Sequence, residues 1–300
     1  MTPVITIGIP FFNAKGTLHD CLRSVFAQTF TQWELLLVDD GSTDGSLEIA
    51  QSVNDRRAHV ISDGTNRGLV YRLNQMIDRS QAPYFARMDA DDLMHPERLT
   101  RQLDYLRQHP EVEIIGSAAY VIDREGQPYG IRGDRPASLT ASIQAGFIHP
   151  TVMATTGWFR RHRYDAEFVR AEDLALWRRA DSGTKCARLR EPLLFYREPL
   201  EFQPAKYRVS CQSIRKLARR YPPSGGWASS VSMIAGTYVK EAAHLALDRV
   251  GLVSALVRRR NRNCEDFEID RAHQILRQIG QVGIPGAQLN GVSAAGLMEW

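Results

Sequence analysis

Residues 33–45 read WELLLVDDGSTDG, a mainly apolar run that ends in two adjacent acids and a glycine-containing turn. Short apolar runs bounded by turn residues are typical of buried β-strands. Two other stretches have the same form, because VITIGI at 4–9 leads into PFFN and YFARM at 84–88 leads into DADD. We therefore expect three buried strands, each followed directly by polar or aromatic residues.

The segments between these strands have helical patterning. Apolar residues recur at helical spacing over 18–26, between the first two strands, and over 69–77, before YFARM. Two more apolar runs, HVI at 59–61 and VEIIGSA at 112–118, continue the alternation of strands and helices. This alternation predicts an α/β fold with a mostly parallel, Rossmann-like sheet flanked by helices. Ligands of such sheets bind outside the carboxyl ends of the strands.

The composition is that of an ordinary globular protein. The 300 residues are 43% hydrophobic and 24% charged, which suits one large domain or one domain with an appendage. The four cysteines lie far apart without a CxxC pair, so we expect neither a disulfide framework nor a zinc site, and a reducing cytoplasm suits them best. The amino terminus lacks the basic region of a signal peptide, and no apolar run reaches the roughly 18 residues of a spanning helix. We expect a cytoplasmic protein that is not an integral membrane protein.

Basic charge is concentrated in the last third of the chain. Residues 201–300 contain 14 Lys and Arg against 8 Asp and Glu, whereas the whole chain has a net charge of +4. The same third has helical patterning interrupted by PPSGG at 222–226, which predicts a C-terminal helical appendage. Its basic excess suits a solvated helical surface, nucleic acid or an anionic membrane, and VRRRNR at 257–262 would suit an anionic leaflet. An ordinary helical packing module is the alternative.

RMDADD at 87–92 places Asp89, Asp91 and Asp92 within four positions. Carboxylates this close raise one another's pKa values unless a cation or hydrogen-bond donors neutralise them. Turn chemistry is a simpler explanation of each acidic stretch alone, as a helix cap after DDGSTDG or as the approach to a helix after DADD. It does not explain why such residues recur at three strand ends. A base, a ribose and a diphosphate would suit the combined set, and the charge of the diphosphate would require Mg²⁺ or Mn²⁺.

Taken together, these stretches resemble a known family. The resemblance rests on VITIGIPFFN, QTFTQWELLLVDDGSTDGS, NRGL, ARMDADDLMHPERL, HPT and AEDLALW, in this order. They are similar to motifs of the inverting family-2 glycosyltransferases, which have the GT-A fold and a DxD motif. The resemblance covers roughly residues 3–198. It implies a GT-A domain over residues 1–200 and leaves a C-terminal helical region over residues 201–300.

The resemblance implies roles on the donor side of the site. Pro10 and Asn13 match the motif that ends the first strand, and Phe12 would stack on the nucleobase without the hydroxyl of the tyrosine usual there. Asp40, the second acid of VDD, would hold the uracil edge, while Asp39 supports its loop. The expected donor is therefore a UDP-sugar.

The DxD motif implies a metal site. Asp89 would lie near the ribose or diphosphate, Asp91 would bind Mn²⁺ or Mg²⁺, and Asp92 would have a structural role. His149, in HPT, would add a metal ligand or contact a phosphate, or it is a packed histidine before a proline. Diphosphate contacts have three arginine candidates, of which no spacing selects one: Arg67, Arg72 and Arg87.

An inverting transfer also requires a base on the acceptor side of the sugar. This carboxylate takes the hydroxyl proton as the acceptor oxygen attacks the anomeric carbon. The family's base aligns with Asp173 of AEDLALW, and Glu172 would orient the acceptor. The alternative is that both acids only enrich the first turn of a helix, where negative charge is favourable.

The sequence thus predicts an inverting, metal-dependent hexosyltransferase that acts in bacterial cell-surface polysaccharide or glycolipid synthesis. Its expected partners are a nucleotide-sugar donor, a glycan or lipid-linked hydroxyl acceptor and the inner face of the membrane, with no nucleic acid. The alternatives are a nucleotide-sugar-binding module without activity, or a nucleotidyltransferase, although PFFN is not the basic phosphate loop that the latter needs. GxGxxG and GxxxxGK[ST] are absent, which disfavours an oxidoreductase and a P-loop enzyme.

Overall fold

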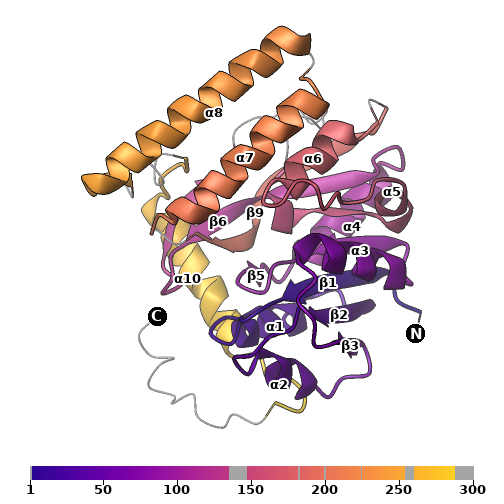
Figure 1. The fold of residues 1–300 in the computed structure, drawn as a ribbon. Coiled ribbons are helices and arrows are strands. Elements are labelled where there is room, and N and C mark those ends of the chain that lie inside the picture. Colours follow the sequence, from indigo (N-terminus) through magenta and orange to yellow (C-terminus); the bar gives the residue numbers. More distant parts are fainter. Residues whose placement is uncertain are drawn as a thin grey trace.

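The computed structural model describes residues 2–134, 147–181, 183–198, 201–223, 225–253 and 260–287. Within these ranges the chain forms one nine-stranded sheet with helices packed on it and a helical hairpin outside (Figure 1). The strands are β1 (Ile5–Phe11), β2 (Trp33–Asp39), β3 (Ala58–Ile61), β4 (Tyr84–Arg87), β5 (Leu93–Met94), β6 (Ile114–Ile122), β7 (Pro128–Arg132), β8 (Met153–Thr155) and β9 (Cys186–Arg197). The helices are α1 (Leu18–Phe26), α2 (Ser46–Gln51), α3 (Leu69–Arg79), α4 (Arg98–Gln108), the short η2 (His149–Thr151), α5 (Thr156–Arg161), α6 (Glu172–Arg179), α7 (Pro204–Arg220), α8 (Gly226–Arg249) and α10 (Asp266–Gly280).

The sheet has a parallel half and a mixed half. Its order is β3-β2-β1-β4-β8-β6-β9-β5, with β7 paired to β6 outside this path. The first four strands of this order are parallel, whereas β8 runs antiparallel to both β4 and β6. β7 is antiparallel to β6 because only a short turn joins them, and a parallel pair needs a longer crossover. The α/β class is confirmed, and the parallel arrangement holds for the amino-terminal half.

The parallel strands β1, β2 and β4 are mainly apolar because both faces of this part of the sheet are covered. Successive side chains of a strand point to opposite faces. On one face, Ile5, Ile7 and Ile9 of β1 join a cluster with apolar residues of α1 and α4. On the other face, Leu36 and Val38 of β2 pack with residues of α3 and α5. This packing fixes the carboxyl ends of β1, β2 and β4 at one edge of the sheet.

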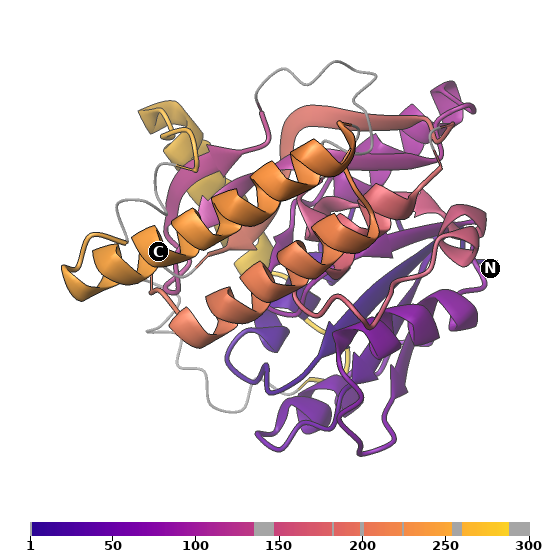
Figure 2. The ribbon, with the colours of Figure 1, turned by 45° about the horizontal axis from the view of Figure 1, so that its top comes forward.

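The C-terminal helices form two groups. α7 and α8 make a hairpin, with α7 next to the body of the protein and α8 outermost (Figures 1 and 2). By contrast, α10 packs against α1 and β7 and buries Ala272 and Ile279 in a cluster with residues of β6 and β9. Residues 257–259 of the basic VRRRNR stretch lie outside the described residues. In the described ranges, no helix is long and apolar enough to span a bilayer.

Candidate active site

A cavity of about 1700 Å³ lies at the carboxyl ends of β1 and β4. Its walls include residue 12 after β1, the first turn of α3, the turn after β4, η2 and the first turn of α6. This is the edge of the sheet at which ligands of such folds gather. The expected site residues that line it are Phe12, Asp89, Asp91, His149 and Asp173, joined by Glu172, Arg67 and Arg87. Pro10, Asn13, Asp39, Asp40, Arg72 and Asp92 are not part of the lining.

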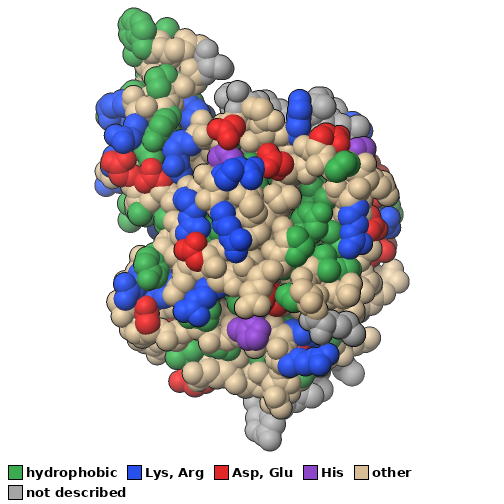
Figure 3. All heavy atoms as spheres, turned by 90° about the vertical axis from the view of Figure 1, so that its right-hand side faces the viewer, with side chains coloured by type: hydrophobic (Ala, Val, Ile, Leu, Met, Phe, Trp, Pro, Cys, Tyr) green, Lys and Arg blue, Asp and Glu red, His purple; other side chains and the backbone are tan. Residues whose placement is uncertain are grey.

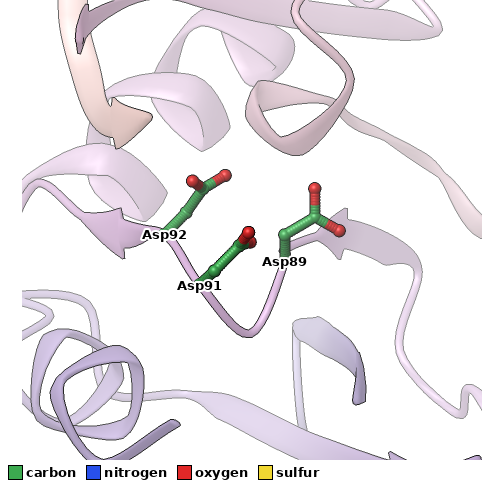
Figure 4. Close-up of side chains that lie close together, drawn as sticks. All are labelled: Asp89, Asp91 and Asp92. Atoms are coloured by element: carbon green, nitrogen blue, oxygen red, sulfur yellow. The ribbon is translucent and has the colours of Figure 1, made fainter. Parts of the chain in front are cut away.

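Three acids share the tight turn between β4 and β5. Figure 4 shows Asp89, Asp91 and Asp92 on this turn, and their nearest carboxylate oxygens lie within 4.8 Å of one another. Asp91 is exposed to the cavity, whereas Asp92 is buried and accepts a hydrogen bond of 2.8 Å from the backbone N–H of Arg197. The other oxygen of Asp92, Oδ2, is buried and has no hydrogen-bond partner among the described residues.

This crowding shifts the pKa values of the turn. Enclosure by the protein, followed by the charge of Asp89, raises the pKa of Asp91 to about 6. Burial raises the pKa of Asp92 well above its usual range, and the charges of Asp91 and Asp89 add to the effect. A divalent cation would reduce the repulsion between the three carboxylates and would give Oδ2 of Asp92 a partner. The donor set consists of carboxylate oxygens, which Mg²⁺ and Mn²⁺ prefer, so the residues present fit such an ion.

Arg87, the last residue of β4, is a buried cation beside this turn. Its Nη2 forms an ion pair with Asp89. Its Nε and Nη1 are buried without a hydrogen-bond partner in the described part of the chain. Unpartnered buried donors are rare and unfavourable in native proteins. Because Arg87 lines the cavity, its guanidinium contributes positive charge to this wall, which favours an anionic ligand.

The first turn of α6 places two acids on the same cavity. Burial is the main cause that raises the pKa of Glu172 and of Asp173 above their usual values, and the positive charge of Arg87 opposes it. The backbone N–H of Leu174 donates a hydrogen bond of 2.7 Å to Oδ1 of Asp173. The turn that precedes α6 contains Arg170 with a φ of 61°, a left-handed conformation that is uncommon outside glycine. A carboxylate with a raised pKa in a cavity is suited to proton transfer.

His149 lies on the cavity wall and is bonded to a tyrosine. Its Nε2 is 2.8 Å from the hydroxyl oxygen of Tyr164. Burial, followed by the charge of Arg87, lowers the pKa of His149 well below its usual value, so the ring is neutral. The acidic cluster of the described residues does not include this histidine. A metal contact by His149 therefore stays a prediction, with Nδ1 as the available ring nitrogen.

Asn13 and Asp39 hold the DDGSTDG loop in place. Oδ1 of Asn13 accepts a hydrogen bond of 2.8 Å from the N–H of Thr43. Asp39 accepts one bond of 2.9 Å from the N–H of Ser42 and another of 2.8 Å from the hydroxyl of Ser62. The half-exposed ring of Phe12 lies next to this loop and faces the cavity. The loop is thus fixed beside the ring that is expected to stack on a base.

Asp40 is buried and ties the NRGL stretch to the sheet. Its Oδ1 accepts hydrogen bonds of 2.8 Å from the N–H of Arg67 and 2.9 Å from Nε of Arg72. Its Oδ2 accepts one of 3.0 Å from the N–H of Gly68. A carboxylate oxygen can accept two bonds, so Oδ2 retains a position for a further donor such as a base N–H. Arg72 is fully buried and also forms an ion pair of 2.6 Å with Asp63.

Replacement of Arg72 by methionine should destabilise the fold. The change leaves the buried Asp40 carboxylate without its charged partner, and loss of one partner from a buried ion pair costs about 3–5 kcal/mol. Urea unfolding measures the difference in the free energy of unfolding. Arg67→Gln is the matched control, because the side chain of Arg67 is 45% exposed in its ion pair with Asp63 and such pairs contribute at most about 1 kcal/mol. Equal effects of the two changes would contradict the prediction.

Several cavity residues belong to no motif that the sequence showed. Arg132 of β7 lines the cavity, as do Arg188 and Tyr196 of β9. Both strands reach the cavity because they pair with β6 in the mixed half of the sheet. Asn74 of α3 also lines it, and its side chain holds the backbone of Tyr164 with bonds of 3.0 and 3.1 Å. No feature of the sequence distinguishes Asn74 from the other polar residues of this amphipathic helix.

Comparison with known proteins agrees with the fold and the motifs. The family model described as Glycosyl transferase family 2 matches residues 6–167. The chain is 32% identical over 208 residues to the putative glycosyltransferase EpsE of Bacillus subtilis, a match of 65% of this chain and 73% of the relative. It is 30% identical over 205 residues to the amylovoran biosynthesis glycosyltransferase AmsE of Erwinia amylovora, a match of 64% of this chain and 75% of the relative.

Solved structures with low sequence identity share the fold. The structure of S. aureus TarS residues 1–349 in complex with UDP has a TM-score of 0.58 at 18% identity, and covers 93% of this chain and 80% of that chain. The mannosyltransferase PcManGT of Pyrobaculum calidifontis, in complex with GDP-Man and Mn²⁺, has a TM-score of 0.57 at 15% identity, and covers 93% of this chain and 86% of that chain. The chain has the GT-A fold and belongs to glycosyltransferase family 2.

Proposed function

We propose that this glycosyltransferase is an inverting, metal-dependent hexosyltransferase that moves a sugar from a UDP-sugar to a hydroxyl acceptor. The observation that carries the proposal is one cavity lined by the acidic turn, by the buried Arg87 and by the two acids of α6. A diphosphate leaving group requires positive charge, and an attacking hydroxyl requires a base. This cavity has candidates for both tasks.

Support for a UDP-sugar donor comes from the base side of the cavity. Phe12 presents its ring for stacking on a nucleobase, and Oδ2 of Asp40 has capacity for the N–H of a uracil ring, with Pro10 and Asn13 shaping the end of β1. TarS, which shares the fold, has been solved in complex with UDP and with UDP-GlcNAc, whereas PcManGT binds GDP-Man. The donor proposal is therefore open to a direct test with both nucleotides.

Two groups would offset the negative charge of the diphosphate, a divalent metal ion and the Arg87 guanidinium. Asp91, with Asp89, would hold Mn²⁺ or Mg²⁺, and His149 would add a contact to the metal or to a phosphate. When bound, such an ion acts as a Lewis acid that stabilises the departing diphosphate. Arg87 would add a buried positive charge beside the phosphates, and a small shift of its side chain would let the unpartnered Nε and Nη1 donate charge-assisted hydrogen bonds, which are stronger than neutral ones.

Asp173 would act as the base. Its carboxylate would take the proton of the acceptor hydroxyl while the acceptor oxygen attacks the anomeric carbon on the face opposite the diphosphate. This single displacement inverts the anomeric configuration and forms no covalent sugar on the enzyme. Glu172, the preceding residue on the cavity wall, would orient the acceptor by accepting hydrogen bonds from its hydroxyl groups.

We further propose that residues 1–200 form the GT-A domain and residues 201–300 a C-terminal helical region. The described part of the chain contains no disulfide, which suits a reducing cytoplasm. The relative AmsE is named as a glycosyltransferase of amylovoran biosynthesis. A role in cell-surface polysaccharide or glycolipid synthesis, with a glycan or lipid-linked acceptor, follows as our proposal.

Calorimetric titration of UDP and of GDP, each with and without Mn²⁺, tests the donor site. We expect UDP to bind in the presence of Mn²⁺ and to bind at least about tenfold more weakly in its absence, because the acids of the turn repel a diphosphate. Preference for GDP would overturn the UDP assignment and leave the enzyme class standing. Absence of binding to either nucleotide would favour a degenerate module and overturn the catalytic proposal.

A further inference from the structure

The most buried residues of α8 are polar, unlike those of an ordinary surface helix. A surface helix buries an apolar stripe and exposes its polar side. The buried residues of α8 are instead Ser230, Thr237 and His244, spaced seven residues apart on the side that packs against α7. The hydroxyl of Tyr207 in α7 lies 3.2 Å from Nδ1 of His244, so this seam combines polar contacts with the partly buried side chains of Met233 and Ile234.

The opposite side of α8 is apolar and exposed. We define its outer face by Trp227, Val231, Ala235, Tyr238, Val239 and Ala242, all of which are exposed. Their spacing of three and four residues places them on one side of the helix. The four large members are exposed by between 50% and 76%. Within this face only Tyr238 has a cation–π partner among the described residues, the Arg215 guanidinium 4.1 Å from its ring centroid. An apolar surface of this length indicates a site of interaction with a partner.

The hairpin that presents this face is strongly basic. Residues 204–249 contain eight Lys and Arg against two Asp and Glu. Among the described residues, no carboxylate lies within ion-pair distance of Lys206, Arg219 or Lys240. Figure 3 shows hydrophobic side chains at the tip of the projection at the upper left of the molecule, with Lys and Arg side chains gathered below them.

We propose that the outer face of α8 docks on the surface of an anionic lipid bilayer. A helix with one apolar side and basic surroundings lies in the plane of the bilayer surface, and anionic lipids attract the basic residues. The aromatic rings of Trp227 and Tyr238 suit the headgroup level of the bilayer. A second copy of this chain fits less well as the occupant, because contact through this face would bring two hairpins of like charge together.

The hairpin is rigidly joined to the wall of the cavity that holds α6. The hydroxyl of Ser213 in α7 donates a bond of 2.7 Å to the carbonyl of Val169, and Lys216 forms an ion pair of 2.9 Å with Glu167. A smaller cavity of about 560 Å³ lies between α6 and the hairpin, and Leu174 lines both cavities. Docking would therefore turn the α6 side of the large cavity toward the membrane. If the proposed function holds, this is the side from which a lipid-linked acceptor would enter.

Vesicle co-sedimentation of the full chain tests the docking surface. We expect the wild type to bind phosphatidylcholine vesicles that contain phosphatidylglycerol, to bind pure phosphatidylcholine more weakly, and to dissociate as salt screens the charges. The double variant Val231→Glu/Val239→Glu should reduce partitioning at least about tenfold, because two charges enter the apolar face. Phe267→Glu is the matched control, since Phe267 of α10 is an exposed apolar residue outside the hairpin, and this variant should bind as the wild type does.

Two further measurements make the result decisive. Circular dichroism and UDP titration of the double variant should match the wild type, which separates loss of docking from loss of the fold or of the donor site. Wild type that does not bind anionic vesicles, or a double variant that binds them equally well, would overturn the proposal. Light scattering tests whether a second copy of the chain occupies this face. A dimeric wild type that does not bind vesicles, together with a monomeric double variant, would assign the face to a second copy.

Discussion

An Asp173→Asn variant is expected to transfer sugar at least about 10²-fold more slowly than the wild type, because general-base catalysis contributes 10²–10⁴-fold. Asparagine keeps the size of the side chain and can still accept the 2.7 Å hydrogen bond from the N–H of Leu174. It cannot accept the proton of the acceptor hydroxyl. The measurement is kcat at saturating donor and acceptor, together with UDP affinity, which should be unchanged.

The pH profile gives this prediction a second readout. Burial raises the pKa of Asp173 above that of an exposed aspartate, so the carboxylate is protonated at a higher pH than usual. The base works only when it is deprotonated. The wild-type rate should therefore fall as pH falls through this raised pKa, and the residual rate of Asp173→Asn should lack that limb.

Glu167→Gln is a matched control for this experiment. Glu167 lies in the same loop region before α6, but it pairs with Lys216 and does not line the large cavity. Its replacement should leave kcat within about twofold of the wild type, as expected for a surface change that touches no catalytic group. Transfer by Asp173→Asn at the wild-type rate would show that the base assignment is wrong.

An Asp91→Asn variant is expected to lose metal-dependent nucleotide binding. Asp91 is the acid of the turn that is exposed to the cavity, while Asp92 is buried and bonded to the backbone of Arg197. Divalent cations held by one or two carboxylates and by phosphate oxygens depend strongly on each carboxylate. We expect the gain in UDP affinity on addition of Mn²⁺ to fall by at least about 10²-fold, as measured by calorimetry.

Asp104→Asn controls for the general loss of one negative charge. Asp104 is exposed on α4, outside the acidic cluster of the described residues. Its replacement should leave the Mn²⁺ dependence intact. If Asp91→Asn binds UDP with the same Mn²⁺ dependence as the wild type, then Asp91 is not a metal ligand and the ion, if any, is held elsewhere.

Local patterns were sufficient for the amino-terminal half of the fold. The mainly apolar runs at 4–9, 33–38 and 84–88 form β1, β2 and β4, because a strand buried on both faces consists mostly of apolar residues. The polar residues at their carboxyl ends meet at one edge because the strands are parallel. That edge has the cavity with Phe12, Asp89 and Asp91, so the sequence predicted where these residues meet, while their roles in donor binding stay a prediction.

The acceptor side was less readable. β8 has only three residues and joins the sheet by antiparallel pairs to β4 and β6. Such a short strand has no periodic signal of its own, and its place depends on contacts between residues distant in sequence. The same long-range pairing brings Arg132 and Arg188 to the cavity. Only the family resemblance, and not a local pattern, singled out Asp173 from the other acids at helix starts.

The sequence by itself therefore determined the α/β class, the strands of the parallel half, the acidic turn and the family. The tertiary structure decided which charges are buried and which sides of helices are covered. Arg87 has two buried, unpartnered donors only because the surrounding elements exclude water from it. α8 shows an apolar outer face because α7 covers its polar side, and a helical pattern in sequence does not state which side of a helix its neighbour will cover. Burial is a property of the whole packed chain, and it is set by contacts that no local pattern contains.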